Sequence, residues 1–261
     1  MTAVAVALRP RAITLLAIAS VLAFIAFTWP FFVQPGSSVS ERDIAPLLFG
    51  GALLLVIAVV HAELSSGGLD SKALALLGVL SAIGAAVRPL GAGTAGIELI
   101  FFLLVLGGRV LGPGFGFVLG CTTLFASAII TAGVGPWMPY QMFGCALVGL
   151  GAGLLPPARG RAELWMLVAY GAASALAYGL MLNLSFWPFA LGEQTHLSYL
   201  PGAAVVTNVH RYLVFDATTS LGWDIGRALT NAVLLLVAGR PVLAALRRAS
   251  RRASFTPWPS P

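Results

Sequence analysis

Residues 221–252 read LGWDIGRALTNAVLLLVAGRPVLAALRRASRR, an apolar stretch that ends in four arginines, Arg247, Arg248, Arg251 and Arg252. A helix of about 20 predominantly apolar residues is long enough to cross the hydrocarbon core of a bilayer. Basic residues close to the end of a membrane span generally remain on the cytoplasmic side. The stretch therefore predicts a membrane helix over 221–240 and a basic cytoplasmic tail over 247–261.

The composition of the whole chain is that of an integral membrane protein, because 59% of the residues are hydrophobic and 9% are charged. Soluble domains contain roughly 45–50% apolar and 25% charged residues. The formal net charge of +6 comes from basic residues in short loops and near the C-terminus, where membrane topology and anionic lipid account for them. We therefore expect membrane lipid as a partner, and no nucleic acid.

Further apolar stretches predict an all-α, polytopic transmembrane helix bundle with eight spans. The first stretch follows basic residues but lacks a small-residue cleavage site, which indicates a retained helix. The fourth is short and crowded by glycines, so we expect it to be tilted, broken or only partly spanning. The predicted spans are 12–33, 44–62, 72–88, 95–107, 110–133, 138–156, 163–185 and 221–240.

Eight spans leave both termini on the cytoplasmic side, and the distribution of basic residues agrees with this orientation. Of the 15 lysines and arginines, 11 then lie on the cytoplasmic side, and the remainder, Arg42, Arg88, Arg211 and Arg227, lie outside. This asymmetry follows the positive-inside rule. Chemistry that recognises an external solute is therefore expected on the face opposite the C-terminal arginines.

The connections expected on the outer face are rich in polar and aromatic residues. Residues 135–141 read GPWMPYQ, and the long connection over about 186–220 mixes aromatic, charged and amide side chains. Because loops often carry binding residues, we take several of these residues as ligand contacts and the long connection as a lid. Aromatic belts at the membrane interface explain the tryptophans and the tyrosine equally well without a ligand. The candidates from this region are Trp137, Tyr140, Gln141, Asn183 and Trp187.

Three polar residues share one face of the last predicted helix. Asp224, Arg227 and Asn231 are spaced by three and four positions, which aligns side chains on a helix surface. Ionisable groups inside membrane helices are costly unless paired or hydrated, so they are candidates for function. The alternative is an Asp224–Arg227 pair that neutralises itself near the interface. That alternative explains Asn231 less well, because this residue lies about ten residues into the helix and hence about 15 Å deep.

A second pair of charges, Arg88 and Glu98, flanks the turn over 89–96. The two side chains are predicted to approach each other, and Glu98 is a candidate ligand contact. A structural explanation is open for each, because a helix dipole favours Glu98 near a helix N-terminus and Arg88 can snorkel towards the interface. The glycine-rich turn does not match a nucleotide-binding loop, since no Gly-Lys-Ser/Thr follows it.

Sequence signatures of enzymes are missing. The three histidines have no metal-ligand spacing, and neither HExxH, Gly-x-Ser-x-Gly nor a nucleotide-binding fingerprint occurs. We therefore expect no catalytic residues, no cofactor and no metal. Uphill movement of a solute would need a partner protein or an ion gradient as its source of energy.

Small residues recur at intervals of four in the predicted helix over 72–88. Gly78, Ala82 and Ala86 form a stripe that would let another helix approach closely. This stripe suggests a docking surface for a partner protein. Internal packing in an alanine-rich chain is the alternative.

Residues 71–240 resemble the substrate-binding S components of energy-coupling factor (ECF) vitamin transporters. The resemblance implies a six-helix core over 71–246, preceded by two additional helices within 1–70. It rests on the alanine-rich helix over 73–88, the short glycine-flanked helix after it, GPWMPYQMF over 135–143, LVGLGAGLLP over 147–156 and WDIGRA over 223–228.

The resemblance implies a non-enzymatic subunit of an ATP-driven importer in a bacterial plasma membrane. Such subunits bind a vitamin or its precursor from outside. They dock through a small-residue stripe, here Gly78, Ala82 and Ala86, to a membrane coupling subunit that is powered by two ABC ATPases. The WDIGRA motif is similar to the branch associated with cobalamin, which is the favoured ligand over another vitamin or a queuosine-type precursor. The rival interpretations are an ion-coupled secondary carrier, a membrane-embedded enzyme acting on a lipid-like substrate, and an assembly protein.

Overall fold

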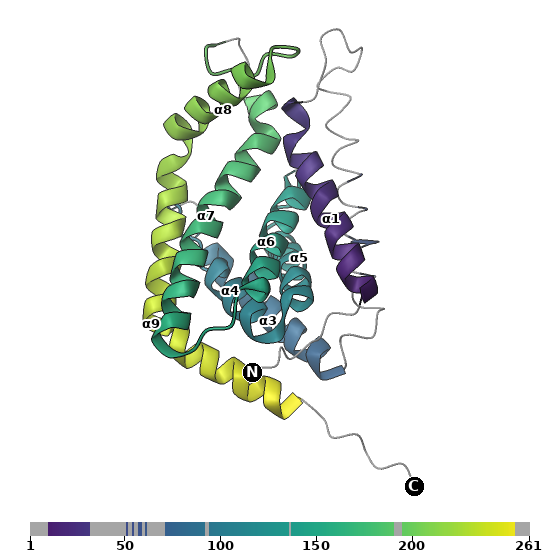
Figure 1. Ribbon diagram of the computed structural model, residues 1–261, viewed down its shortest axis with the longest axis vertical. Helices are drawn as coiled ribbons and strands as arrows, with labels where there is room; N and C mark the ends of the chain where they lie inside the picture. Colours follow the sequence, from purple (N-terminus) through teal and green to yellow (C-terminus); the bar gives the residue numbers. More distant parts are fainter. Residues whose placement is uncertain are drawn as a thin grey trace.

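The computed structural model describes residues 10–31, 51, 54, 57, 58, 61, 71–91, 94–135, 137–190 and 195–253. Over these ranges the chain is helical and contains no strand, which confirms the predicted all-α class (Figure 1). The predicted span over 44–62 falls almost entirely outside these ranges. The helices are α1(Pro10–Thr28), α3(Ser71–Gly91), α4(Ile100–Leu111), α5(Pro113–Ile130), α6(Met138–Leu154), α7(Gly160–Ala190), α8(Val205–Thr219) and α9(Leu221–Ala253), and a short 3-10 helix, η1(Trp29–Phe31), follows α1.

Four of the described helices are long and apolar enough to cross a membrane, so the chain is a membrane protein. They contain the segments Lys72–Gly91, Pro113–Ile130, Gly160–Pro188 and Leu221–Arg251. Shorter apolar helices cover Leu16–Thr28 and Ile100–Leu111. The arrangement of a six-helix core after two further helices stays a prediction.

The centre of the bundle is formed by α4, α5 and α6. Helix α4 has 12 residues, which corresponds to about 18 Å and is too short to cross the hydrocarbon core alone. Helix α4 ends at Leu111 and is followed by Gly112, whose φ of 110° is a conformation that glycine adopts readily. Pro113 then starts α5. Helices α5 and α6 approach so closely that a Cβ atom on Gly116 would collide with the backbone of Gly149.

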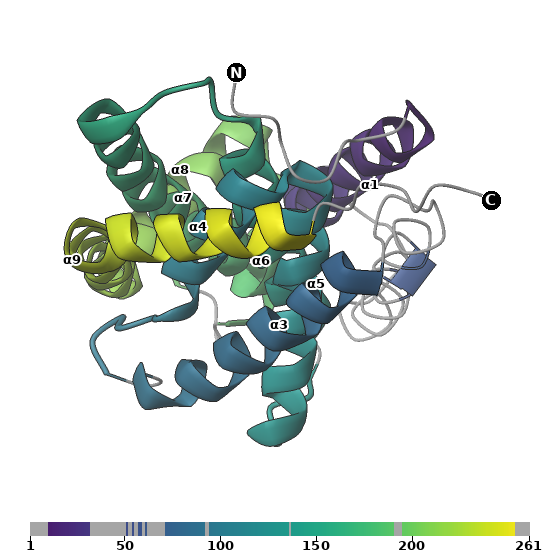
Figure 2. The same cartoon turned by 90° about the horizontal axis from the view of Figure 1, so that it is seen from below.

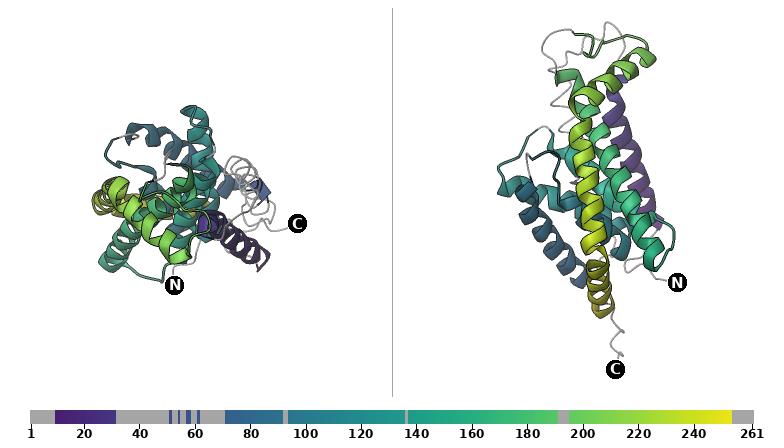
Figure 3. Two further views of the ribbon diagram at one scale, coloured as in Figure 1. Left: turned by 90° about the horizontal axis from the view of Figure 1, so that it is seen from above. Right: turned by 90° about the vertical axis from the view of Figure 1, so that its left-hand side faces the viewer.

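The other helices surround this centre. Helix α1 packs against α6 and α7, and α3 packs against α5, so the two stand on different sides of the bundle (Figure 3). Helices α7 and α9 pack against each other along their length. Helix α9 carries charged residues near both of its ends, Asp224 and Arg227 at one and Arg247 at the other.

The predicted connection over 186–220 is largely helical, which corrects the expectation of a loop. Helix α7 continues to Ala190, and α8 occupies Val205–Thr219 across the upper ends of α7 and α9 (Figure 1). The physical reason lies in the spacing of the residues that α8 buries, Asn208, Tyr212, Phe215 and Asp216. Separations of three and four positions bring them to one helix face.

Helix α9 also extends further than expected, because it continues to Ala253 through the region predicted as a tail. Pro241 lies inside this helix, and a proline removes a backbone hydrogen bond and commonly bends a helix. The last part of α9 turns and lies across the lower end of the bundle (Figure 2). Leu243 and Leu246 are buried there, so this segment is held to the bundle by an apolar face.

Candidate functional site

Four charged residues form a continuous chain of ion pairs where α3, α4 and α9 meet. Arg88 Nε lies 3.3 Å from Glu98 Oε1, and Glu98 Oε2 lies 3.7 Å from Arg227 Nε. Arg227 Nη1 lies 2.6 Å from Asp224 Oδ1 on the preceding turn of α9. The predicted approach of Arg88 to Glu98 is thus confirmed. The self-neutralising Asp224–Arg227 pair is present as well, but it is part of a larger group, the charge chain.

The charge chain is largely shielded from solvent. The side chains of Arg88 and Glu98 are 21% exposed, that of Arg227 is 12% exposed and that of Asp224 is 4% exposed. Two arginines and two carboxylates give the group a formal charge of zero. Buried charges are tolerated when each has an opposite charge beside it, and the alternation along the chain provides this.

The Arg227 side chain also contacts two aromatic rings. Its guanidinium lies 5.1 Å from the ring centre of Tyr178 and 5.9 Å from that of Phe101. Such cation–π contacts hold a guanidinium in a fixed orientation. Arg227 Nε has no hydrogen-bond partner among the described residues. The site therefore holds an arginine in a fixed position, whose buried Nε meets Glu98 only at ion-pair distance.

Arg88 connects the charge chain to α5 and α6. Its two terminal nitrogens lie 3.4 Å from Ser127 Oγ and 3.4 Å from Gln141 Oε1. These are long hydrogen bonds. They bring Gln141, one of the predicted ligand contacts, to the same group as Glu98 and Arg227.

A cavity of about 400 Å³, the α8 cavity, opens beside Asp224 and Arg227. Three of the predicted ligand contacts line it, namely Asn183, Asp224 and Arg227. One part of its wall is polar and charged, and another is aromatic. The full lining is Gly179, Leu182, Asn183, Phe186, Phe215, Thr219, Ser220, Trp223, Asp224 and Arg227.

Close approach of α7 to α9 shapes one side of this cavity. Gly179 on α7 faces the Asp224 carboxylate, and a Cβ atom at position 179 would collide with both carboxylate oxygens. Only a residue without a side chain leaves Asp224 in its present position. Gly179 therefore sets the position of the charge nearest to α7.

An aromatic cluster beside the α8 cavity joins α7 to α8, and one of its members, Phe215, lines the cavity. Trp187 is fully buried against Tyr199, Tyr212 and Phe215. The indole Nε1 of Trp187 donates a hydrogen bond to the Leu197 carbonyl at 2.8 Å. Trp187 was predicted as a ligand contact, but its ring lies inside this aromatic cluster and does not line the α8 cavity.

Two hydrogen bonds also join α7 to α8 beside the cavity. Asn183 Nδ2 donates a hydrogen bond to Asp216 Oδ1 at 2.6 Å, and the Tyr212 hydroxyl donates to the Leu180 carbonyl. Burial, followed by the neighbouring charge of Asp216, raises the pKa of Tyr212. Tyr212 therefore stays a neutral hydrogen-bond donor. Sequence reasoning did not single out Asp216, although its spacing of four from Tyr212 was a detectable signal.

The remaining predicted contacts lie apart from the α8 cavity. The Tyr140 ring packs against Phe27 at 5.3 Å, and Trp137 is 53% exposed. Asn231 is fully buried one turn below Arg227 and donates from Nδ2 to the Gly171 carbonyl at 2.8 Å. Its Oδ1 atom has no partner among the described residues. A ligand-binding role for these three residues stays a prediction.

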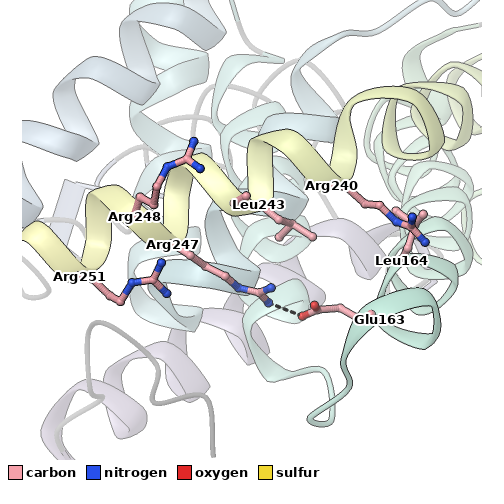
Figure 4. Close-up of a pocket in the computed structure, with 9 residues that line it drawn as sticks. Glu163, Leu164, Arg240, Leu243, Arg247, Arg248 and Arg251 are labelled. Carbon is pink, nitrogen blue, oxygen red and sulfur yellow. Dashed lines mark hydrogen bonds and ion pairs between the residues drawn. The ribbon is translucent and has the colours of Figure 1, made fainter.

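A second charged group lies at the opposite end of α9 (Figure 4). Glu163 Oε1 accepts hydrogen bonds from Arg109 Nε at 2.8 Å and from Arg247 Nη2 at 2.7 Å. Glu163 is 2% exposed. Sequence reasoning missed this residue, and the signal available was an isolated carboxylate at the start of an apolar helix.

The small-residue stripe on α3 faces outwards. Gly78, Ala82 and Ala86 are all exposed, and no group lies within 4 Å of a Cβ atom built on Gly78. The helix packs through its other face, where Ser81 Oγ lies 2.7 Å from Thr122 Oγ1 on α5. Internal packing against the described part of the chain therefore does not account for the stripe.

No group of three or more His, Cys, Asp or Glu side chains within the described ranges could hold a metal ion. Both cysteines are free and buried. Comparison with protein-family models, with characterised protein sequences and with solved structures gives no match for this chain. Any functional conclusion therefore depends on the site itself.

Proposed function

We propose that the protein is the solute-capturing subunit of an ATP-driven importer of the energy-coupling factor type. In this proposal the α8 cavity binds a vitamin or vitamin precursor at the outer face of a bacterial plasma membrane. A membrane coupling subunit and a pair of ABC ATPases then drive its delivery to the cytoplasm. The observation that carries the proposal is the charge chain beside a cavity that residues of α7, α8 and α9 line.

The chemistry of the cavity wall supports a polar ligand that also has an apolar ring system. The charge chain has no net charge, so it offers donors and acceptors together and favours a neutral or zwitterionic molecule over a strongly charged one. Phe186, Phe215 and Trp223 provide aromatic surface. Pockets that bind small molecules typically combine apolar walls with a few placed polar groups. Vitamins and their precursors have this mixed character.

The volume of the α8 cavity supports a small ligand in the present conformation. About 400 Å³ is within the range of roughly 300–1,000 Å³ that is usual for small-molecule pockets. A single-ring vitamin fits this space. Cobalamin, the ligand favoured by the sequence resemblance, is much larger and would bind only after α8 had moved outwards. Helix α8 is thus proposed as the lid.

The exposed stripe on α3 supports docking to a coupling subunit. Small side chains at Gly78, Ala82 and Ala86 leave a shallow surface, along which another membrane helix can pack closely. Arg88 of the charge chain follows Ala86 of the stripe by two positions on α3, so the two groups are neighbours on one helix. A partner on the stripe could therefore displace Arg88 and disturb the ligand site, which is a route from docking to release.

A transport assay separates this proposal from an ion-coupled carrier and from an enzyme. The chain is expressed in a bacterial host, alone or together with an energy-coupling factor module from its native host, and uptake of labelled vitamins including cobalamin is measured. The proposal expects binding without accumulation for the chain alone, and ATP-dependent accumulation with the module. Accumulation by the chain alone that collapses with the ion gradient would favour the carrier. Chemical conversion of a lipid-like substrate by the purified chain would favour the enzyme.

A further inference from the structure

A second cavity, of about 340 Å³, lies between the start of α7 and the end of α9. We call it the arginine cavity, because Arg240, Arg247, Arg248 and Arg251 all line it, together with Glu163 (Figure 4). It is distinct from the α8 cavity and shares no residue with it.

The arginine cavity carries an excess of positive charge. Glu163, the only carboxylate among the described lining residues, already accepts hydrogen bonds from both Arg109 and Arg247. Arg240 and Arg248 are exposed, and neither makes an ion pair within the described ranges. Four arginines against one carboxylate leave the described lining with an excess of positive charge, which favours an anion.

The position of the cavity in the bundle is that of a membrane surface. Arg240, directly before Pro241, follows Arg227 by 13 residues on α9, a path of about 20 Å along a helix. Past Pro241 the helix lies across the end of the bundle (Figure 2). Trp165 on α7 is 56% exposed beside the lining residue Leu164. Exposed tryptophans are typical of the interface between lipid and water.

We propose that the arginine cavity binds a phosphate group, carried by the headgroup of an anionic lipid or present as free phosphate. Guanidinium groups bind phosphate through paired hydrogen bonds. Basic pockets between membrane helices on the cytoplasmic side are suited to lipid headgroups. The apolar lining residues Leu164, Leu243 and Ala244 lie next to the arginines, and they fit the acyl and glycerol part of a lipid as well as its phosphate.

The test compares two double variants of the full-length protein in a neutral detergent. Arg240→Gln with Arg248→Gln removes two charges from the cavity lining. Arg159→Gln with Arg161→Gln removes two exposed charges at the start of α7 that do not line the cavity. Binding of phosphatidylglycerol, cardiolipin and phosphatidylcholine is measured by native mass spectrometry, and binding of inorganic phosphate by the shift in melting temperature.

The proposal expects the cavity variant to bind the anionic lipids about tenfold more weakly or worse, and the control variant to bind them like the wild type. Melting temperature without lipid monitors folding, so that loss of binding in a stable variant is meaningful. A lipid source is indicated when inorganic phosphate gives no shift, and a free-phosphate source when phosphate alone stabilises the wild type but not the cavity variant. Equal loss in both variants, or no preference of the wild type for any phosphate anion over phosphatidylcholine, would overturn the proposal.

Discussion

Asn183 Nδ2 donates a hydrogen bond to Asp216 Oδ1 at 2.6 Å, and this bond ties α7 to α8 beside the α8 cavity. Neither residue is close to the other in sequence, so the bond depends on α8 lying across α7. A bond of this kind to a charged acceptor contributes about 1.5–3 kcal/mol. The bond is therefore a candidate latch that holds α8 against α7.

Replacement of this latch should speed ligand release. Asn183→Ala is expected to raise the dissociation rate of the bound vitamin about tenfold, because α8 then opens at a lower cost. Thr218→Ala, at an exposed position on α8, is the control and should leave the rate within about twofold. Stopped-flow dissociation of a labelled vitamin checks both. Identical release rates for the wild type and Asn183→Ala would count against α8 as a lid.

Two glutamates that each bridge two arginines allow stability and binding to be separated. Glu98→Gln removes the carboxylate between Arg88 and Arg227, while Asp224 still pairs with Arg227. It should cost about 1–3 kcal/mol of stability and abolish ligand binding. Glu163→Gln removes the equivalent carboxylate between Arg109 and Arg247. It should destabilise the protein by a similar amount but preserve affinity for the vitamin. Melting temperature and equilibrium binding are measured for both variants, and equal loss of binding in both would show that the charge chain has no special role.

A methyl group at position 179 should disturb the site directly. Gly179→Ala puts a Cβ atom where the Asp224 carboxylate lies, so Asp224 must move and its ion pair with Arg227 weakens. We expect at least about a tenfold loss of vitamin affinity. In Gly222→Ala the new methyl group meets nothing within 4 Å, so this control should keep the vitamin affinity and stabilise the helix by up to about 1 kcal/mol. Calorimetric titration of the two variants provides the comparison, and unchanged affinity in Gly179→Ala would contradict the assigned role of Asp224.

A bulky residue on the α3 stripe should block transport without blocking capture. Ala82→Trp fills the exposed stripe between Gly78 and Ala86 and is expected to abolish ATP-dependent uptake. Val237→Trp adds the same side chain at an exposed position of α9 and should transport normally. Uptake by cells and binding by the purified protein are both measured. Loss of binding in Ala82→Trp, or normal uptake by it, would argue against docking through the stripe.

The parts of the site that the sequence predicts are those set by local geometry. Asp224 and Arg227 are one helical turn apart, and the residue spacing alone predicts that they share a face. Arg88 and Glu98 flank one short turn, so their approach also follows from the sequence. The short helix between glycines and the long apolar spans are detectable for the same reason, because length and hydropathy are local properties.

The parts that the sequence does not predict depend on distant contacts. Glu163 is bound by arginines that lie 54 and 84 positions away in the chain. No local sequence pattern predicts these contacts. Helix α8 was missed because its buried face includes the polar residues Asn208 and Asp216, so the segment is not apolar enough to resemble a membrane span. The helix after Pro241 was missed because a proline after an apolar span commonly marks its end.

The most direct test of a solute-capturing α8 cavity is to identify what the protein carries. The full-length chain is purified in detergent from vitamin-supplemented cells of its native host, and bound small molecules are identified by mass spectrometry. Asp224→Asn and Glu163→Gln are purified in parallel. We predict near-stoichiometric vitamin or vitamin precursor in the wild type and in Glu163→Gln, and its loss from Asp224→Asn. A wild-type protein without any bound vitamin, whose melting temperature is also unchanged by added cobalamin or single-ring vitamins, would contradict the proposed function.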